Sequence, residues 1–418
     1  MGESEVRRTV ETVWRMEAGR VVAGIAGIVR DVGLAEELAQ DALVAALEQW
    51  PRDGVPANPG AWLTTVGKRR AIDALRRRQT RERTLAELGR DLDEQVNPDF
   101  DAAVEDRIED DLLRLIFVAC HPVLSPIARA ALTLRLIGGL TTGEIARAFL
   151  TTEPTVGQRI TRAKQTLAAA RVPFEVPGPA DRAERLDSVL EVVYLIFNEG
   201  YAATAGDDLM RPALCQEALR LARQLQALMH GEPEVHGLAA LLEIQASRTH
   251  ARTAPDGEPI LLNDQDRRRW DQLLIRRGLA ALDRARTDHP GPYAVQAEIA
   301  ACHARARTPE ETDWARIAAL YAELARLVPS PVVELNRAVA IAQAEGPAAG
   351  LAAARALADE PALAQYHLLP SVLGDLLAKL GRHDEARQEF ERAASLVDNA
   401  RVRALLLDRA ADCGQKKS

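Results

Sequence analysis

The sequence predicts an all-α protein made of two small helical domains followed by a longer extension of helical repeats. Among its 418 residues Ala, Leu, Arg and Glu dominate, whereas aromatic residues make up only 4%. Those four residue types favour helix, while strands are built mainly from Val, Ile, Thr and aromatic residues. The length exceeds that of one ordinary domain, and a hydrophobic content of 47% supplies material for several cores.

Three features of the sequence indicate a cytoplasmic protein. No apolar run approaches the roughly 18 residues that a membrane span requires. The N-terminal residues lack the basic and apolar regions of a secretory signal. The four cysteines lie far apart and form no CxxC pair, which is typical of a reduced cytoplasmic protein rather than a disulfide scaffold or a zinc site. We therefore expect a cytoplasmic chain with no membrane partner and no metal.

The net charge of −8 conceals an uneven distribution along the chain. Residues 66–83 contain eight basic and two acidic side chains, residues 91–111 contain ten acidic and one basic, and residues 129–171 contain seven basic and two acidic. Two basic blocks separated by an acidic one indicate two anion-binding modules joined by a solvated linker. We expect that linker at residues 91–111.

The first module, residues 1–90, is predicted to contain helices on either side of a break at Pro51–Gly60. The helix before the break has a polar face at helical spacing, formed by Glu37, Gln40 and Asp41. After the break, Asn58 and Pro59 supply an N-cap and a first-turn proline for a helix that ends in the arginine run. The apolar side of the earlier helix is expected to comprise Leu34, Leu38, Leu43, Leu47 and Trp50.

The second module, residues 112–172, has the pattern of a helix-turn-helix. A short helix is expected to start near Thr141 or Thr142, and Thr152 is expected to cap the second helix, with Pro154 in its first turn. One face of the second helix is apolar and the other carries Thr, Gln and Arg side chains that can contact base edges in the major groove of DNA. The apolar face comprises Val156, Ile160, Ala163 and Leu167, and the polar face Thr155, Gln158, Arg159 and Arg162.

The extension, residues 173–418, begins within a proline-rich stretch at residues 172–179 that is typical of a domain boundary. A tetratricopeptide-repeat (TPR) pattern is strongest near its end, and we expect TPR-like helix pairs at about residues 315–400. Because one helix pair cannot bury its own apolar face, a stack of pairs is expected. The TPR positions are Gly374, Leu377, Ala386, Phe390 and Ala393, with Gly381 in the turn.

Together these motifs resemble the extracytoplasmic-function (ECF) group of sigma factors in the sigma-70 superfamily. The resemblance covers roughly residues 10–170, and the tail is similar to that of the ECF subgroup with a long TPR-like C-terminal extension. Region 2 of that family is matched by Ala35–Asp41 and Trp62–Arg78, and region 4 by Leu124–Pro126, Leu140–Ala146 and Thr155–Ala163.

The resemblance implies binding to core RNA polymerase and to promoter DNA, with the polymerase performing the chemistry. Polymerase would be bound by Glu37, Gln40 and Asp41. The −10 promoter element would be bound by Asn58, Trp62, Arg69, Arg70, Arg76 and Arg77, where the arginines suit phosphates. The −35 element would be bound by Thr155, Gln158, Arg159, Arg162 and Lys164. The pattern departs from the family at Gly157, where sigma factors often have Lys or Arg.

No catalytic constellation stands out in the sequence, so we expect neither an enzyme nor a bound cofactor. The extension is expected to bind a regulatory protein or to make an intramolecular contact. Two alternatives stay open at this stage. One is a TPR-type scaffold with vestigial N-terminal domains, which would have no need of two basic helices. The other is a helix-turn-helix activator that does not replace the sigma subunit, which would have no need of the polymerase-binding face.

Overall fold

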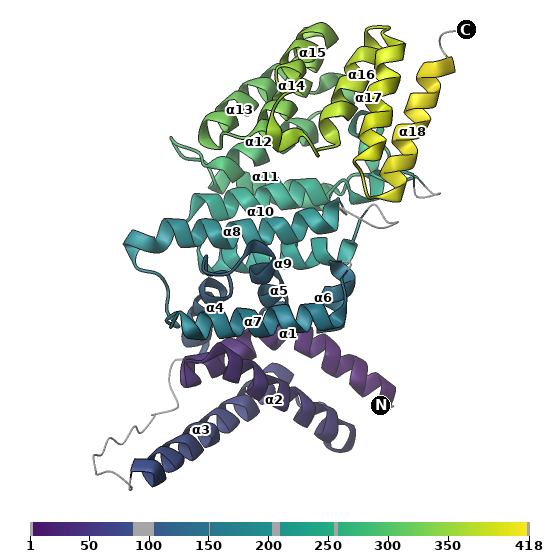
Figure 1. Cartoon of the computed structure of the whole chain (residues 1–418). Coiled ribbons are helices and arrows are strands. Elements are labelled where there is room, and N and C mark those ends of the chain that lie inside the picture. The colour runs from purple at the N-terminus through teal and green to yellow at the C-terminus, as the bar shows by residue number, and fades with distance from the viewer. Residues whose placement is uncertain (1–2, 87–103, 150, 203–209, 255–257, 416–418) are drawn as a thin grey trace. The chain divides into compact units, whose positions relative to one another are not determined.

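The computed structural model describes residues 3–86, 104–149, 151–202, 210–254 and 258–415 (Figure 1). Within these ranges the chain is helical, and extended backbone pairs only at an isolated antiparallel bridge between Thr253 and Pro259. The all-α prediction is confirmed. The chain divides into two compact units, Met1–Leu195 and Ile196–Ser418. In the described part of the chain, no helix combines the length and the apolarity that crossing a membrane requires.

The first unit begins with α1 (Glu3–Val29), α2 (Val32–Asp53) and α3 (Pro59–Ala86), which pack on one another. The side chain of Asp31 caps α2, and that of Asn58 caps α3 as predicted, each by accepting a backbone N–H at 3.0 Å. α2 continues through Pro51 and ends at Gly54, whose φ of 86° takes the chain out of the helical region. The break between the two helices is therefore shorter than predicted.

The helix-turn-helix is also present in this unit, as α6 and α7. Thr141 and Glu144 form a capping box at the start of α6. The hydroxyl of Thr152 caps α7, with Pro154 in the first turn, so both predicted starts are confirmed. All four residues of the predicted apolar stripe of α7 are buried. The helices of this part are α4 (Val104–Ala119), α5 (Pro126–Leu136), α6 (Thr142–Ala148), α7 (Glu153–Ala169) and α8 (Pro179–Tyr201).

The two predicted modules pack into one body within the first unit. α4 packs along α1, so that the carboxylate of Asp111 approaches Gly27 and the side chain of Leu112 approaches Gly19. This differs from the expectation of a solvated linker at residues 91–111. Residues 91–103 lie outside the described residues, and residues 104–111 form the first half of α4. The second half of α4 is buried against its neighbours through apolar side chains from Leu112 to Ala119, which stabilises the helix.

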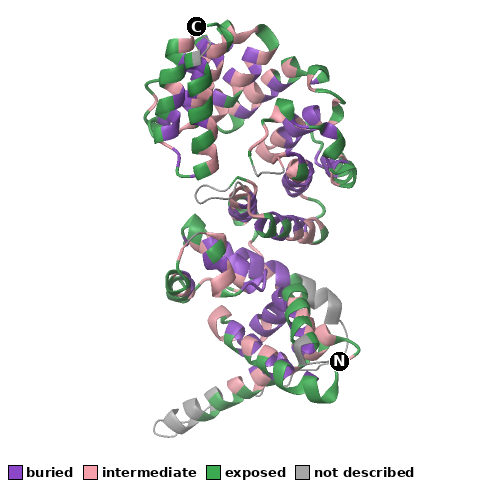
Figure 2. Ribbon diagram, turned by 90° about the vertical axis from the view of Figure 1, so that its right-hand side faces the viewer, coloured by how far each residue is buried: buried purple, intermediate pink, exposed green. Residues whose placement is uncertain are grey.

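The second unit is a series of helices in which successive members pack on one another. Their buried sides face inward, as the colouring of Figure 2 shows. The helices are α9 (Pro212–Leu228), α10 (Pro233–Ala246), α11 (Gln272–Arg284), α12 (Pro292–Arg305), α13 (Trp314–Leu327), α14 (Pro331–Glu345), α15 (Pro347–Arg355), α16 (Leu368–Lys379), α17 (His383–Ser395) and α18 (Ala400–Gln415).

The predicted TPR positions form a tightly packed helix pair, α16 and α17. Gly381 lies in the turn between them with a φ of 74°, a conformation that favours glycine. A Cβ built on Gly374 would lie 2.9 Å from the ring of Phe390, so only glycine allows this close approach. Phe390 and Ala386 are buried in the core cluster of the pair. The TPR-like pattern therefore corresponds to an observed helix pair.

Two polar side chains join the beginning of the second unit to its middle. Glu234, in the first turn of α10, accepts backbone N–H groups of Tyr293 and Ala294 at 2.8 and 3.0 Å and so caps α12. Arg267 is only 8% exposed and donates to the backbone oxygens of His303 and Ala306 at 2.9 and 2.8 Å. It also donates to the hydroxyl of Thr312 at 2.8 Å.

Candidate functional site

The polar face of α2 is open to solvent. Glu37 and Asp41 are exposed and Gln40 is half-buried. Beside them Val44 is 51% exposed and Leu47 is 38% exposed, so the predicted place of Leu47 on the apolar side is wrong. Helical spacing places positions 37, 41, 44 and 48 on one side of the helix, so the period alone could have found Val44. We call Glu37, Gln40, Asp41, Val44 and Leu47 the α2 face. Its exposed apolar side chains, Val44 and Leu47, are a feature of protein-binding surfaces, and the acidic side chains beside them suit a basic partner.

One residue of the α2 face pairs with a predicted DNA-binding residue. Asp41 and Arg70 of α3 approach to 3.1 Å, and both remain substantially exposed. An ion pair with this exposure contributes little to stability. Arg70 is therefore available to another anion at low energetic cost. The α2 face and the basic side of α3 lie next to each other.

The start of α3 brings together Asn58 and Trp62. The side-chain oxygen of Asn58 accepts the N–H of Ala61, so this exposed residue offers its amide N–H₂ group to other partners. Trp62 is half-buried and its ring meets that of the buried Trp50 edge to face, with centroids 5.5 Å apart. The ring of Trp62 thus contacts the core on one side and reaches the surface on the other.

The arginines of α3 extend from this point along the helix. Arg69, Arg76 and Arg77 are exposed, and Arg70 is half-buried. Arg77 donates from Nε to the backbone oxygen of Asp73 at 3.2 Å, which leaves its terminal nitrogens free to bind a phosphate. The remaining basic residues at the end of the run lie among side chains outside the described residues. α3 therefore presents positive charge along one helix.

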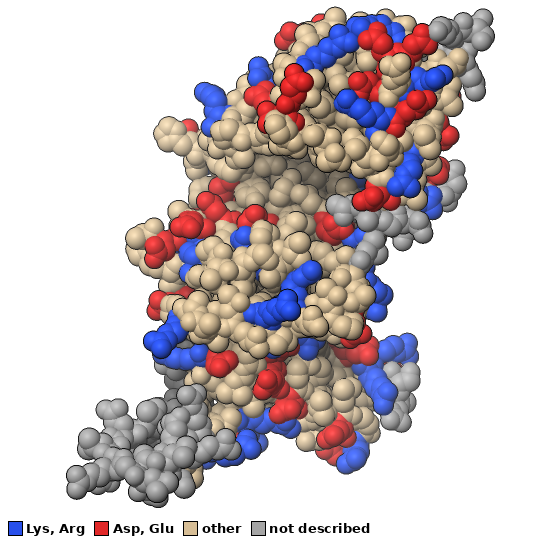
Figure 3. Space-filling model, viewed as in Figure 1, with Lys and Arg blue, Asp and Glu red and all other residues tan. Residues whose placement is uncertain are grey.

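The outward side of α7 carries the other predicted DNA-binding residues. Thr155, Gln158 and Arg162 are exposed and Arg159 is half-buried. Together with Ser125 and its neighbours at the start of α5, they line a hollow of about 320 Å³. Figure 3 shows basic side chains over α7 on the face turned to the viewer. The buried stripe on the opposite side fixes the orientation of these four side chains.

Lys164 does not lie free on this surface. Its Nζ pairs with the carboxylate of Glu36, a buried residue of α2, and Arg135 of α5 binds the other carboxylate oxygen at 2.6 Å. Burial alone would raise the pKa of the Glu36 carboxyl, but Lys164 and Arg135 hold it below its usual range. In this structure Lys164 is thus part of an ion-pair network between α2, α5 and α7. Its contact with DNA stays a prediction, and the structure adds that its charge is paired inside the protein in this conformation.

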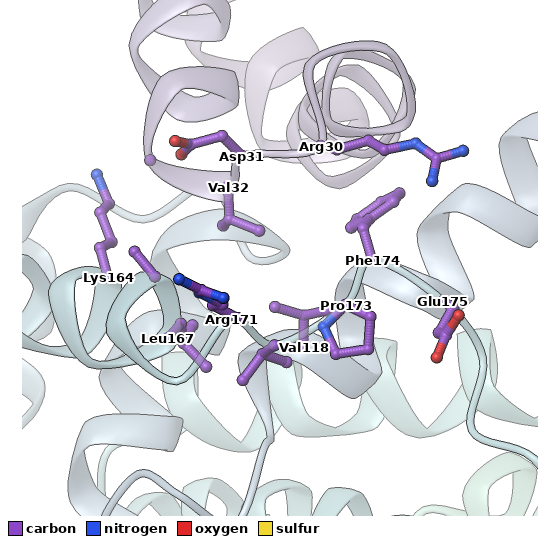
Figure 4. A pocket seen from close by; sticks show the side chains of 13 residues that line it. Arg30, Asp31, Val32, Val118, Lys164, Leu167, Arg171, Pro173, Phe174 and Glu175 are labelled. Carbon is purple, nitrogen blue, oxygen red and sulfur yellow. The ribbon is translucent and has the colours of Figure 1, made fainter.

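A pocket of about 410 Å³ adjoins Lys164, between the α1–α2 turn and the end of α7 (Figure 4). The turn contributes Arg30 and Asp31, while Arg171 comes from just beyond α7. Phe174 approaches Arg30 from the segment that follows α7. Arg30 and Arg171 both have left-handed backbone conformations, with φ of 52° and 50°. These two residues turn the chain sharply on either side of the pocket.

Comparison with known proteins identifies the two basic modules. The sigma-70 region 2 family matches residues 14–81, and the sigma-70 region 4 family matches residues 114–167. The ECF RNA polymerase sigma factor SigK of Mycobacterium ulcerans is 30% identical over 147 residues, which cover 34% of this chain and 74% of SigK. The chain belongs to the ECF-like sigma factors with a C-terminal extension. SigK of Mycobacterium tuberculosis (strain H37Rv) is 28% identical to this sigma factor over 152 residues, covering 35% and 78% of the two chains.

The extension of the sigma factor has its own match. A family of unknown function, DUF6596, matches residues 185–286. "Uncharacterized protein R00370" of Rhizobium meliloti (strain 1021) is 49% identical over 374 residues, which cover 89% of this chain and 88% of that protein. The sigma modules and the extension therefore occur together in a relative. The crystal structure of yeast Tom70 aligns with 99% of this chain and 86% of the Tom70 chain, with a TM-score of 0.32 and 12% sequence identity. Both values are too low for the likeness to bear on function.

The predicted site residues of the sigma factor all fall within the matched regions. Those from Glu37 to Arg77 lie in the region 2 match, and those from Thr155 to Lys164 lie in the region 4 match. The described residues contain no group of three or more His, Cys, Asp or Glu side chains arranged to hold a metal ion. All four cysteines are buried free thiols, and burial raises the pKa of Cys120 to about 11.

Proposed function

We propose that this sigma factor binds core RNA polymerase through the α2 face and holds promoter DNA with α3 and α7. The observation that carries the proposal is the division of α7 into a fully buried stripe and an outward row of Thr, Gln and Arg side chains. That division presents hydrogen-bond donors for base edges on a helix whose rotation is fixed by its core. The polymerase performs the chemistry of transcription.

The contacts that we propose at the −10 element differ in kind. The exposed arginines of α3 would bind phosphates and contribute affinity that falls with salt. The amide of Asn58 and the accessible edge of Trp62 would contact bases of the opened strand, since unpaired bases stack on aromatic rings. Arg69 and Arg76 are fully available for this because no ion pair engages either side chain within the described residues.

Run-off transcription with purified core polymerase and promoters of the source genome tests the proposal. The double variant Arg159→Ala/Arg162→Ala should keep its fold and lose transcription, with a loss of promoter affinity of about 10-fold or more. Arg8→Ala removes an exposed arginine of α1 and serves as the matched control. If the double variant transcribes as well as the control, the assignment of α7 to the −35 element is wrong.

The α2 face is tested separately by binding to core polymerase. Glu37→Lys and Val44→Asp change exposed side chains for which the structure gives no ion pair within the described residues. Each should weaken polymerase binding without altering the affinity of the free protein for promoter DNA. Glu11→Lys reverses an exposed charge on α1 and provides the control. Equal polymerase binding by all three variants would contradict the assignment of the α2 face.

We also propose that the helical extension regulates the sigma factor. The support is that α8 belongs to both compact units and supplies partners to region 4. Ser188 accepts from Arg129 and donates to the backbone oxygen of Cys120, and Glu191 pairs with Arg129 at 3.0 Å. A fragment of residues 1–202 keeps these partners of region 4. Its transcription should differ from that of the full chain, and equal promoter responses would contradict a regulatory role.

A further inference from the structure

Three arginines and two aromatic rings lie together inside the second unit. The guanidinium carbon of Arg252 is 3.7 Å from the centroid of the Tyr201 ring. That of Arg267 is 5.2 Å from the centroid of the Trp270 ring. Arg248 lies between the two rings, with its guanidinium carbon 5.8 Å from each centroid. We call these five residues the arginine cluster. The two other guanidiniums lie within about 11 Å of that of Arg248, close enough for the like charges to repel.

No carboxylate pairs with these charges in the described part of the chain. The three acceptors of Arg267 are two backbone oxygens and a hydroxyl, all of them uncharged. Arg252 donates to the backbone oxygen of Tyr201, which is uncharged as well. Glu310 and Glu311 act on Arg267 from beyond ion-pair distance, and both are exposed. The arginine cluster therefore holds positive charge without a counter-ion, an arrangement that costs free energy inside a protein.

The electrostatics of the cluster reflect this imbalance. Burial lowers the pKa of Arg252, and the positive charge of Arg248 lowers it further. The same two causes, in the same order, lower the pKa of Arg267. An anion placed among the three guanidiniums would remove this repulsion.

Several nitrogens of the cluster are also buried without a hydrogen-bond partner. They are Nε of Arg248, Nε of Arg267 and the indole N–H of Trp270. Trp270 is only 3% exposed and Arg267 is 8% exposed, so solvent does not replace the missing partners. Buried N–H groups are nearly always paired in proteins. Three unpaired donors at one place therefore indicate a site for an acceptor.

The cluster is accessible from one side. Trp270 and Arg267 are buried, whereas Tyr201, Arg248 and Arg252 are half-buried. The Tyr201 ring is already stacked on that of Phe197, with centroids 5.3 Å apart, and Arg252 lies over it. A flat aromatic ligand would therefore find this ring engaged. The guanidinium of Arg248 forms neither a hydrogen bond nor an ion pair with the described residues, so its N–H groups are free to bind a compact oxyanion.

We propose that the arginine cluster is a binding site for the phosphate group of a small molecule, with Arg248 as its principal ligand. A phosphate dianion supplies the negative charge that the three guanidiniums lack. Its oxygens also match the paired N–H groups of a guanidinium, which bind phosphate in a bidentate manner. Inorganic phosphate and a small phosphate ester share this chemistry. The inference concerns the extension alone and does not depend on the proposed contacts with polymerase or promoter DNA.

Isothermal titration calorimetry of the full chain tests the site, with inorganic phosphate and glycerol 3-phosphate as probes. Potassium chloride at equal ionic strength is the reference, so that general effects of salt cancel. We expect one phosphate group to bind per chain. At 100 times its Kd it should raise the melting temperature by at least about 5 °C over the chloride reference. Tighter binding of inorganic phosphate identifies the free anion as the ligand, and tighter binding of glycerol 3-phosphate identifies an ester.

Substitution of Arg248 locates the binding. Arg248→Met should bind phosphate at least about tenfold more weakly than the wild type, because it removes the guanidinium that has no partner. Arg269→Met changes an exposed arginine next to Trp270 and is the matched control, which should bind as the wild type does. Circular dichroism establishes that each variant is folded. If Arg248→Met does not fold, Arg248→Lys decides: it keeps the charge but loses the paired N–H groups, and should weaken binding at least about threefold.

Two results would overturn the proposal. One is a wild type that responds to phosphate no more than to chloride, as expected if the cluster only stabilises the fold through contacts between cations and rings. The other is phosphate binding by the folded Arg248 variant that equals binding by Arg269→Met. Neither result bears on transcription, so failure of this site and failure of the proposed function are distinguished.

Discussion

Gly157 provides a sharp test of how α7 works. This residue lies inside α7, the helix that we propose contacts the −35 element. A Cβ built on it would have no atom within 4 Å, so larger side chains fit without displacing a neighbour. Three substitutions separate the effect of this residue on helix stability from its effect on the charge facing DNA. Gly157→Ala raises helix propensity alone. Gly157→Lys and Gly157→Glu raise it to a similar extent and also introduce a positive or a negative charge.

The expected magnitudes follow from the position. Replacing glycine by alanine inside a helix stabilises it by about 1 kcal/mol, which corresponds to a rise of roughly 2–4 °C in the melting temperature of a unit of this size. The lysine variant should add one phosphate contact on the −35 duplex. The logarithm of its affinity should then fall more steeply with the logarithm of salt concentration, by about 0.9.

Differential scanning calorimetry and fluorescence anisotropy measure these two quantities. All three variants should be at least as stable as the wild type, whereas only the lysine variant should bind more tightly and the glutamate variant should bind more weakly. Destabilisation by alanine would show that the backbone at Gly157 is not helical in the working protein. Equal affinities of the lysine and glutamate variants would refute the placement of this side of α7 against DNA.

Three further predictions concern buried groups. Arg129→Met removes the partner of Ser188 and Glu191 and should lower the free energy of unfolding by about 3 kcal/mol in urea titrations. Burial, together with the nearby arginine charges, lowers the pKa of His303 from its usual 6.5 to about 3. The neutral imidazole is therefore compatible with the fold above pH 6.5, and stability is lost as the pH falls from 6.5 toward 3, because the unfolded chain binds the proton first. His303→Gln should flatten the dependence of stability on pH in that window. The thiol of Cys120, with its pKa raised to about 11 by burial, should resist iodoacetamide at pH 8 until the protein is unfolded.

The helix-turn-helix was predictable from sequence because its signals are local. The hydroxyls of Thr141 and Thr152 begin its helices, and the spacing of four apolar residues in α7 fixes the buried side. A capping residue and its target lie within one turn of each other, so no knowledge of the tertiary structure is needed. The same holds for Asn58 at the start of α3.

The surroundings of α2 could not be predicted in this way. Leu47 has the right period for a buried stripe but is 38% exposed, because the neighbouring helices do not cover that end of the face. The sequence predicts a DNA contact for Lys164 from its place on α7, but it gives no sign of the partner Glu36, which lies 128 residues earlier in the chain. An ion pair between distant helices leaves no periodic signal in either segment. Its existence depends on how α1, α4 and α5 pack.

Arg267 has a consequence for the modular organisation of the extension. The matched DUF6596 segment ends at residue 286, but the three acceptors of this buried guanidinium lie at residues 303–312. Glu234 also lies within the segment, and its carboxylate caps α12, which lies outside the segment. A fragment that ends at residue 286 would leave the buried guanidinium of Arg267 without its three acceptors. The start of α12, in the remaining part of the chain, would lose its cap. The family match and the independent folding unit therefore have different boundaries. A segment that is to fold in another protein must extend at least through Thr312.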